Sequence, residues 1–207
     1  MAVNRRWLVG SGILAVSWAL HAQHLPTLSV DAYETIVANP ETPAAGATAA
    51  DVTIVEFFDY NCPFCRQMHP QLAQLLREDA HVRVLYKEWP VFGATSEYAA
   101  RSAIAANWQG KYLAAHDALI ASRHDLDEIA DVDAVLKAAG VDLGKLERDR
   151  KLHAAQIEAV LTRVAAEAGK LGLQGTPGFI VGRQFIPRSM SLPQVRALVA
   201  RSRSDAK

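Results

Sequence analysis

The stretch VTIVEFFDYNCPFC, residues 52–65, contains the features that decide the fold. Its first seven residues are β-branched or aromatic apart from Glu56, and such a nearly continuous apolar run is typical of a strand buried on both faces. The polar residues 59–61 interrupt this pattern, and a helix is predicted over about 62–77. Pro63 falls in the first turn of that helix, where its missing N–H costs no hydrogen bond. We therefore expect a buried strand that turns directly into a helix.

The pattern along the rest of the chain predicts a mixed α/β protein. A second strand is expected at 82–87, and because a helix connects the two strands they should run parallel. From 94 to 171 the alanine-rich sequence shows only helical patterns, with Ser96 as the expected cap of the first helix. The remaining predicted elements are a short helix at 31–38, strands at 178–182 and 184–186, and a closing helix from Ser191 to about Arg201.

The composition is that of a globular protein and excludes several classes of function. The 207 residues carry 22 basic and 22 acidic side chains, so the formal net charge is zero. A dedicated nucleic-acid-binding protein would normally show a basic surplus, so we expect no nucleic-acid partner. Two cysteines are too few for a small scaffold held together by disulfides.

Residues 1–22 have the layout of a secretory signal peptide. Arg5 and Arg6 precede an apolar run from Trp7 to Leu20, which is shorter than the roughly 20 residues that a membrane-spanning helix needs. A general secretory signal is favoured, with a twin-arginine signal or a retained membrane anchor as alternatives. Export, expected here to the periplasm, would place the two cysteines where disulfides can persist.

Cys62 and Cys65 are the residues that point to chemistry. Cys62 lies at the predicted helix N-terminus, where unpaired N–H groups and the helix dipole favour a negative charge and lower a thiol pKa. Cys65 lies about one turn further along the same helix, so it can displace a mixed disulfide formed on Cys62. A redox pair is the favoured interpretation. The alternatives are a zinc site with His69 as a third ligand and a pair of inert packing thiols.

Two motifs far apart in the sequence resemble one known family. The segment 55–65, VEFFDYNCPFC, together with GTPGF at 175–179 and KEWPVFG at 87–93, is similar to the DsbA-like thiol–disulfide oxidoreductases of the thioredoxin superfamily. The similarity runs over about residues 40–203. It implies an α/β thioredoxin fold with an inserted all-helical subdomain. The predicted parts are a signal peptide at 1–22, an N-terminal extension at 23–50, the first half of the core at 51–93, the helical insertion at 94–172 and the second half of the core at 173–207.

The resemblance also implies roles for individual residues. Cys62 matches the exposed attacking cysteine of the family, and Cys65 matches the buried resolving cysteine. Pro177 matches a cis-proline that faces the disulfide, and Thr176 before it would offer backbone groups to an extended substrate.

Glu56 matches the buried acid of the superfamily, which would exchange protons with Cys65. An ion pair between Glu56 and Lys87 is an equally weighted alternative. His69 is expected to be an ordinary surface residue of the helix. Three aromatic residues would line either a peptide-binding surface or the core: Tyr60, Trp89 and Phe92.

The predicted function is thiol–disulfide exchange with exported proteins, most simply as a dithiol oxidase. A disulfide isomerase or reductase on the same fold is the nearest alternative, and Thr176 before the proline is shared with that branch. A non-catalytic peptide-binding chaperone or a metal carrier is a less favoured alternative. No metal or organic cofactor is expected, but a membrane redox partner would be needed to reset the cysteines. The sequence leaves the oligomeric state open.

Overall fold

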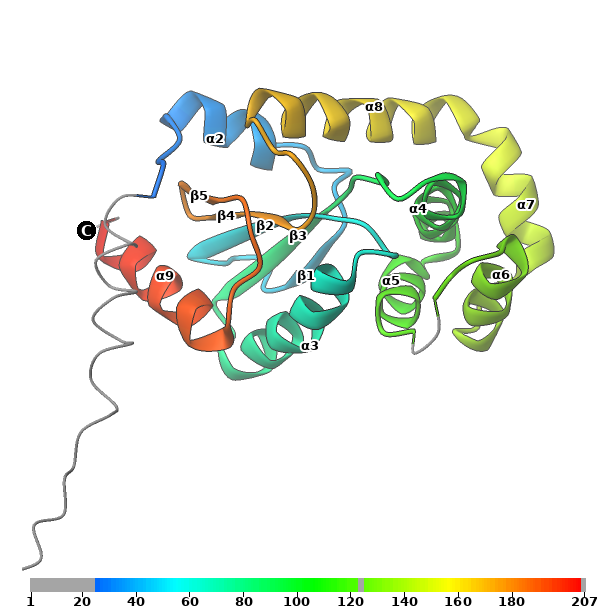
Figure 1. Ribbon diagram of the computed structural model, residues 1–207, viewed down its shortest axis with the longest axis horizontal. Helices are drawn as coiled ribbons and strands as arrows, with labels where there is room; N and C mark the ends of the chain where they lie inside the picture. The colour runs from blue at the N-terminus through cyan, green and yellow to red at the C-terminus, as the bar shows by residue number, and fades with distance from the viewer. Residues whose placement is uncertain (1–24, 123–124, 206–207) are drawn as a thin grey trace, which may run out of the picture.

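A computed structural model describes residues 25–122 and 125–205 of the chain (Figure 1). The predicted signal peptide at 1–22 therefore lies outside the described residues. Within them, five strands form one sheet in the order β1-β3-β2-β4-β5. The strands are β1 (Ala44–Gly46), β2 (Val52–Phe58), β3 (Val82–Glu88), β4 (Gly178–Val181) and β5 (Gln184–Ile186).

The two central strands are arranged as the sequence predicts. β2 and β3 run parallel, whereas β4 pairs antiparallel with β2 on its other side. Every residue of β2 is buried, as expected for an apolar strand in the middle of a covered sheet. The helix that connects β2 to β3 is α3 (Pro63–Glu78), which begins immediately after the carboxyl end of β2.

Helices cover both faces of the sheet. Figure 1 shows α3 and α9 (Leu192–Asp205) on one face, with α2 (Val30–Val37) and α8 (Ala154–Lys170) on the other. Each face has its own core: Phe58 and Tyr86 pack on the α3 side, and Phe57 and Leu85 pack on the α2 and α8 side. Period-two alternation along the strands produces this division.

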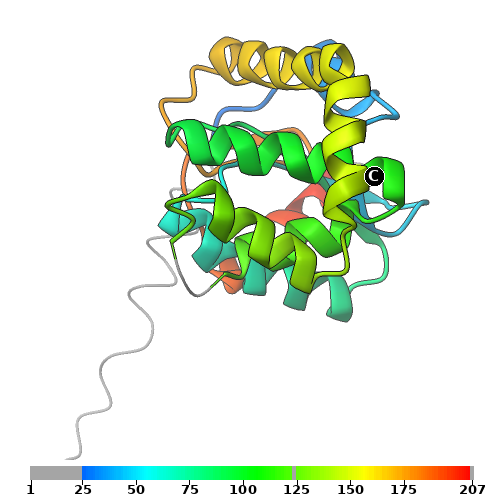
Figure 2. The same ribbon diagram turned by 90° about the vertical axis from the view of Figure 1, so that its right-hand side faces the viewer.

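The helical segment between β3 and α8 forms one end of the molecule, as Figure 2 shows. It consists of α4 (Ala94–Ala106), the short 3-10 helix η1 (Asn107–Gln109), α5 (Tyr112–Ile120), α6 (Ile129–Ala138) and α7 (Leu143–Leu152). The predicted fold class, a thioredoxin fold with an inserted all-helical subdomain, is confirmed. None of the helices in 25–122 and 125–205 has the length and apolar character that crossing a membrane requires.

One strand was not predicted, and one predicted helix cap was wrong. β1 was not predicted, because its Ala-Ala-Gly sequence lacks β-branched residues; it forms by pairing antiparallel with β3. Gly46 ends it with φ of 96°, and a Cβ there would come within 2.4 Å of the Val82 carbonyl oxygen. Ser96 does not cap α4, whose N-cap is Gly93. Ser96 lies within α4 instead, where its side chain is buried and its hydroxyl donates a hydrogen bond to the Asp59 carboxylate.

Candidate functional site

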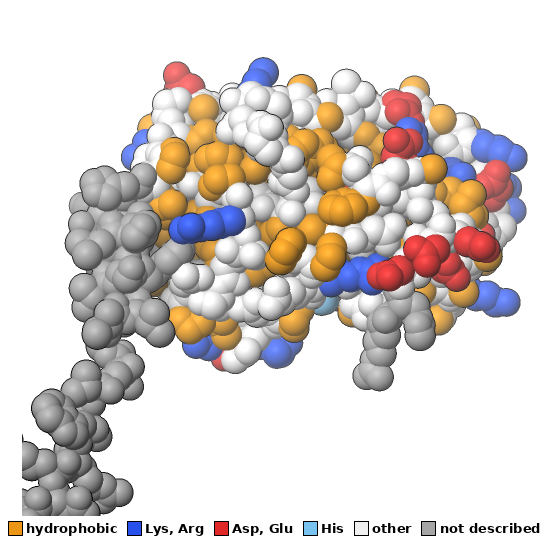
Figure 3. Space-filling model, viewed as in Figure 1, with side chains coloured by type: hydrophobic (Ala, Val, Ile, Leu, Met, Phe, Trp, Pro, Cys, Tyr) orange, Lys and Arg blue, Asp and Glu red, His pale blue; other side chains and the backbone are white. Residues whose placement is uncertain are grey.

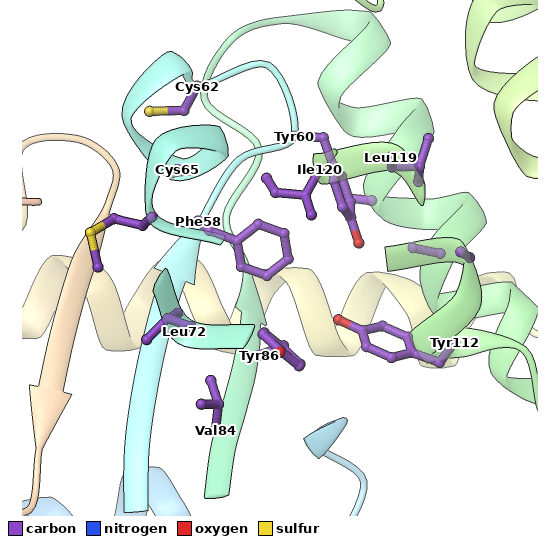
Figure 4. Close-up of a cluster of buried hydrophobic side chains, with 14 of the residues drawn as sticks. Phe58, Tyr60, Cys62, Cys65, Leu72, Val84, Tyr86, Tyr112, Leu119 and Ile120 are labelled. Carbon is purple, nitrogen blue, oxygen red and sulfur yellow. The ribbon is translucent and has the colours of Figure 1, made fainter. Parts of the chain in front are cut away.

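The two cysteines lie where the central strand turns into its helix. Cys62 is the N-cap of α3, and Cys65 is in the first turn. Both are free thiols, and Figure 4 shows Cys62 at the start of α3, with Phe58 packed beneath that turn. The resemblance implies an exposed Cys62, but its side chain is only 1% exposed. The difference arises because the Thr176 carbonyl lies directly against the sulfur.

Hydrogen-bond donors around Cys62 stabilise its thiolate. They lower the pKa of Cys62 to about 6, against burial, which raises it. The largest contribution is the hydrogen bond from the Cys65 thiol, followed by the Thr176 side chain and the backbone N–H groups of Cys65 and Phe64. Those N–H groups are the unpaired donors of the first helical turn.

Thr176 and Pro177 come to the thiols from a segment far away in the sequence. The Thr176–Pro177 peptide bond is cis. As a thiol, Cys62 donates to the Thr176 carbonyl oxygen over 3.2 Å, across 114 residues of sequence. The Thr176 hydroxyl is buried and, among the described residues, forms no hydrogen bond in this structure. It is therefore free to rotate toward the Cys62 sulfur once that sulfur is ionised.

Cys65 and Glu56 are held in the neutral form by their surroundings. Burial, the hydrogen bond to Cys62 and the nearby Glu56 charge all raise the pKa of the Cys65 thiol. Burial, with a smaller contribution from Cys62, raises the pKa of Glu56 to about 8. A protonated carboxyl therefore lies close to both thiols at neutral pH.

The ion pair considered between Glu56 and Lys87 does not form. Glu56 is in register with Tyr86 on β3, so Lys87, one residue further along, points to the opposite face of the sheet. There Lys87 Nζ lies 3.0 Å from a carboxylate oxygen of Glu167 on α8 and donates to the Ile36 carbonyl oxygen.

Asp59 fixes the turn that presents the cysteines. One of its carboxylate oxygens accepts from the Ser96 hydroxyl at 2.7 Å, and the other accepts from the backbone N–H groups of Val91 and Phe92. Arg66 secures the other side of the turn by donating from Nε to the Tyr60 carbonyl oxygen. Sequence reasoning missed the role of Asp59, since its partners are more than 30 residues away.

An open groove of about 570 Å³ lies beside the cysteine motif, with Phe64 of that motif in its lining. Phe64, Thr176, Pro177 and Pro187 contribute to its lining. Phe64 is 57% exposed although it is aromatic, and Val91 and Phe92 are exposed nearby on the loop that Asp59 holds. Figure 3 shows hydrophobic side chains exposed on the face of the molecule that is seen in Figure 1.

The three aromatic residues singled out from the sequence have different surroundings. Tyr60 belongs to the core on the α3 side, and its hydroxyl lies 3.3 Å from Nδ1 of the buried His116. Trp89 is half-buried and packs on the opposite side of the sheet. Phe92 is exposed and remains a candidate for peptide contact.

The proposed metal set of Cys62, Cys65 and His69 does not come together. Among the described residues, the group of three side chains placed to hold a metal is His69, His116 and Asp117. His69 is not an ordinary surface residue, because only 16% of its side chain is exposed. Burial lowers the pKa of His116 to about 3, so this imidazole is neutral at pH 7. No sequence motif indicated that α5 would place His116 and Asp117 beside α3.

Comparisons with known proteins identify the family and the fold. The thioredoxin family model matches residues 38–201. A thioredoxin-like oxidoreductase from Silicibacter pomeroyi DSS-3 is 37% identical, with a TM-score of 0.78 over 86% of this chain and 99% of that one. The thiol-disulfide exchange protein alpha-DsbA2 from Wolbachia pipientis has the same fold at 22% identity, with a TM-score of 0.76 over 93% of this chain and 99% of that one.

Part of this chain is also similar to part of a much longer protein. The Na(+)/H(+) antiporter NhaA 3 from Salinispora tropica is 33% identical over 139 residues, which cover 66% of this chain and 21% of the antiporter. The chain therefore spans about a fifth of the length of the antiporter that it matches.

Proposed function

Because the chain belongs to the thioredoxin family and has the fold of a DsbA-like oxidoreductase, we propose that Cys62 and Cys65 are its redox pair and that it oxidises the thiols of exported proteins. Glu56, Thr176 and Pro177 complete the proposed site. The observation that carries the proposal is the set of hydrogen-bond donors aimed at the Cys62 sulfur.

These donors favour the oxidising direction for a thermodynamic reason. They stabilise a thiolate that exists only in the reduced protein, so they stabilise the reduced form relative to the disulfide. A protein whose reduced form is stabilised accepts electrons readily from substrate thiols. The lowered pKa of Cys62, about 6, also makes it the better leaving group when a mixed disulfide is resolved.

The proposed reaction proceeds in two exchanges. A substrate thiolate attacks the Cys62 sulfur of the Cys62–Cys65 disulfide, and Cys65 leaves with the electron pair of the broken bond. Protonated Glu56 supplies a proton to the Cys65 thiolate, whose raised pKa favours the thiol. A second substrate thiolate then attacks the substrate sulfur, forming the substrate disulfide and releasing the Cys62 thiolate. The protein gains two electrons and the substrate loses two.

The surroundings of the site support a proposed substrate class, and the predicted signal peptide supports a proposed location. The apolar groove beside Thr176 and Pro177 suits an extended polypeptide, with Phe64 as an exposed contact. The predicted signal peptide at 1–22 supports a periplasmic location, where substrate disulfides persist. Reoxidation requires a redox partner that accepts the two electrons, and we propose a membrane protein for that role.

The reduction potential of the cysteine pair tests the direction of the reaction. Equilibration with glutathione buffers should give a value less negative than about −200 mV, on the oxidising side of the glutaredoxins. A value near that of thioredoxin, about −270 mV, would contradict the oxidase and favour the isomerase or reductase.

Two cysteine variants test whether the pair is catalytic. Cys62→Ser should abolish both dithiol oxidation and insulin reduction. Cys65→Ser should abolish dithiol oxidation, because no Cys62–Cys65 disulfide can form, and should retain the mixed disulfides that Cys62 forms with substrate disulfides, because Cys65 is absent to displace them. Unchanged oxidation and reduction in Cys62→Ser would contradict a catalytic role for the cysteine pair.

A further inference from the structure

His116 on α5 is a buried imidazole with one nitrogen unused. Its side chain is 1% exposed, and Nε2 is buried with no hydrogen-bond partner among the described residues. Leaving a buried polar atom unpaired costs about 1–3 kcal/mol. The function proposed for the cysteines makes no use of this nitrogen, so its presence calls for a ligand.

The other nitrogen of His116 is held by a neighbour that fixes the ring. Nδ1 lies 3.3 Å from the Tyr60 hydroxyl. Aromatic rings surround the imidazole: the ring centroid of Tyr86 is 4.0 Å away, that of Phe58 is 4.9 Å away, and that of Tyr112 is 5.9 Å away. Figure 4 shows these aromatic side chains converging from β2, β3 and α5. A histidine bound to a metal is typically oriented in this way, through a hydrogen bond from its second nitrogen.

Two further metal-ligating side chains lie close to His116. Its ring centroid is 5.7 Å from that of His69 on α3, and His69 Nε2 is 3.8 Å from an Asp117 carboxylate oxygen. One ligand atom from each of the three residues falls within 4.8 Å of the others. The Asp117 side chain is 60% exposed, so it can rotate inward and leaves one side of the group open to solvent.

From this geometry we infer that His69, His116 and Asp117 form a binding site for a divalent transition metal of the zinc class. Two imidazoles and a carboxylate, with a fourth position open to water, are a ligand set that zinc accepts at about 2.0–2.2 Å. Magnesium and calcium prefer oxygen ligands only, so two nitrogen donors disfavour them. The site uses neither cysteine and does not depend on the redox function.

Such an ion would join two parts of the chain. His69 belongs to the helix that carries the cysteines, whereas His116 and Asp117 belong to the helical insertion. A metal bound to both would stabilise the packing of α5 against α3. Tyr60 lies two residues before Cys62, so it links the orientation of His116 to the turn that presents the thiols.

Zinc binding to the full-length protein tests the site, with the thiols removed from competition. The oxidised protein and a Cys62→Ala/Cys65→Ala variant are each titrated with zinc against a chromophoric chelator. We expect one zinc per chain in both. Cobalt(II) in place of zinc should give the visible absorption of a tetrahedral site, and zinc should raise the melting temperature.

Single substitutions separate this site from adventitious binding. His69→Gln and Asp117→Asn should each weaken zinc binding by more than about 100-fold, since losing a ligand costs more than losing an outer partner, which typically costs about 10–100-fold. Tyr60→Phe, which removes such an outer partner, should weaken binding about tenfold. The control His81→Gln, at an exposed histidine outside the group, should leave binding unchanged.

Two results would overturn the inference. One is the failure of both thiol-free proteins to bind zinc, which would leave His69 and Asp117 as a polar side-chain pair that holds no metal. The other is stoichiometric binding that neither His69→Gln nor Asp117→Asn weakens, which would place the ion elsewhere. Neither result bears on the redox function, because the cysteines are blocked or absent in both titrations.

Discussion

Glu56 and Lys87 are ionisable residues buried on opposite faces of the same sheet, and their surroundings differ. Lys87 faces α2 and α8, where Glu167 and the Ile36 carbonyl oxygen satisfy its ammonium group. Glu56 faces α3 and the two thiols, where burial and the Cys62 charge keep its pKa high. A buried charge that has a partner supports the fold, whereas a buried acid held neutral beside a reactive group can transfer protons.

Breaking the buried ion pair between Lys87 and Glu167 should cause the largest loss of folding stability. Lys87→Met leaves the nearly buried Glu167 carboxylate unpaired, so the free energy of unfolding should fall by about 3–5 kcal/mol in urea denaturation. Thiol oxidation per folded molecule should stay unchanged. The double variant Lys87→Met/Glu167→Leu should recover most of the loss, because it removes both charges. A Lys87→Met variant that is stable but oxidises thiols slowly would contradict the assignment of stability to the Lys87 face and of proton transfer to the Glu56 face.

Removing the acid on the other face should slow the exchange reaction without destabilising the protein at pH 7. Glu56→Gln should slow dithiol oxidation at least about tenfold in stopped-flow measurements, since the amide supplies no proton to Cys65. The control Glu88→Gln changes another buried acid with a raised pKa, one that Tyr112 already contacts through its hydroxyl, and should leave the rate unchanged. Equal slowing in both variants would count against a proton-transfer role for Glu56.

The pH dependence of stability gives a second test of Glu56. Its pKa is raised from 4.5 to about 8 in the folded protein, so the wild type loses stability as pH rises from about 4.5 through 8. Glu56→Gln lacks this group and should become more stable than the wild type over the same range. The measurement uses oxidised protein, because the Cys62 thiolate would add an opposite pH dependence in the reduced form. Parallel stability curves for the two proteins would contradict the raised pKa.

Thr176→Val tests the hydrogen bond from the Thr176 hydroxyl to the Cys62 thiolate, for which we expect the smallest effect. Losing the hydroxyl should raise the pKa of Cys62 from about 6 toward its ordinary value and make the reduction potential more negative. Because other donors remain, we expect less than a tenfold change in the redox equilibrium constant. Ultraviolet thiolate absorbance measured against pH reports the pKa. The matched variant Thr95→Val on α4 should shift neither quantity, and a lowered pKa in Thr176→Val would exclude the proposed hydrogen bond.

The strand-to-helix turn was predictable because its determinants are local. An apolar β-branched run, three polar residues, a proline and two cysteines at i and i+3 define β2, the start of α3 and the spacing of the thiols. The parallel pairing of β2 and β3 followed from the helix between them. β1 was missed, since its residues have little intrinsic preference for a strand and form one only against β3.

The sequence by itself determined the pair of thiols and the helix that begins at them, because both depend on residues within a few turns of one another, and the paired motifs at 55–65 and 175–179 indicated the class of the fold by resemblance. Only the tertiary structure decided which face Glu56 and Lys87 occupy, since a shift of one residue in strand register reverses every side chain. It also decided that Thr176 covers Cys62 and that His116 meets His69. Those contacts join segments far apart in the chain, and packing, rather than any local pattern, brings them together.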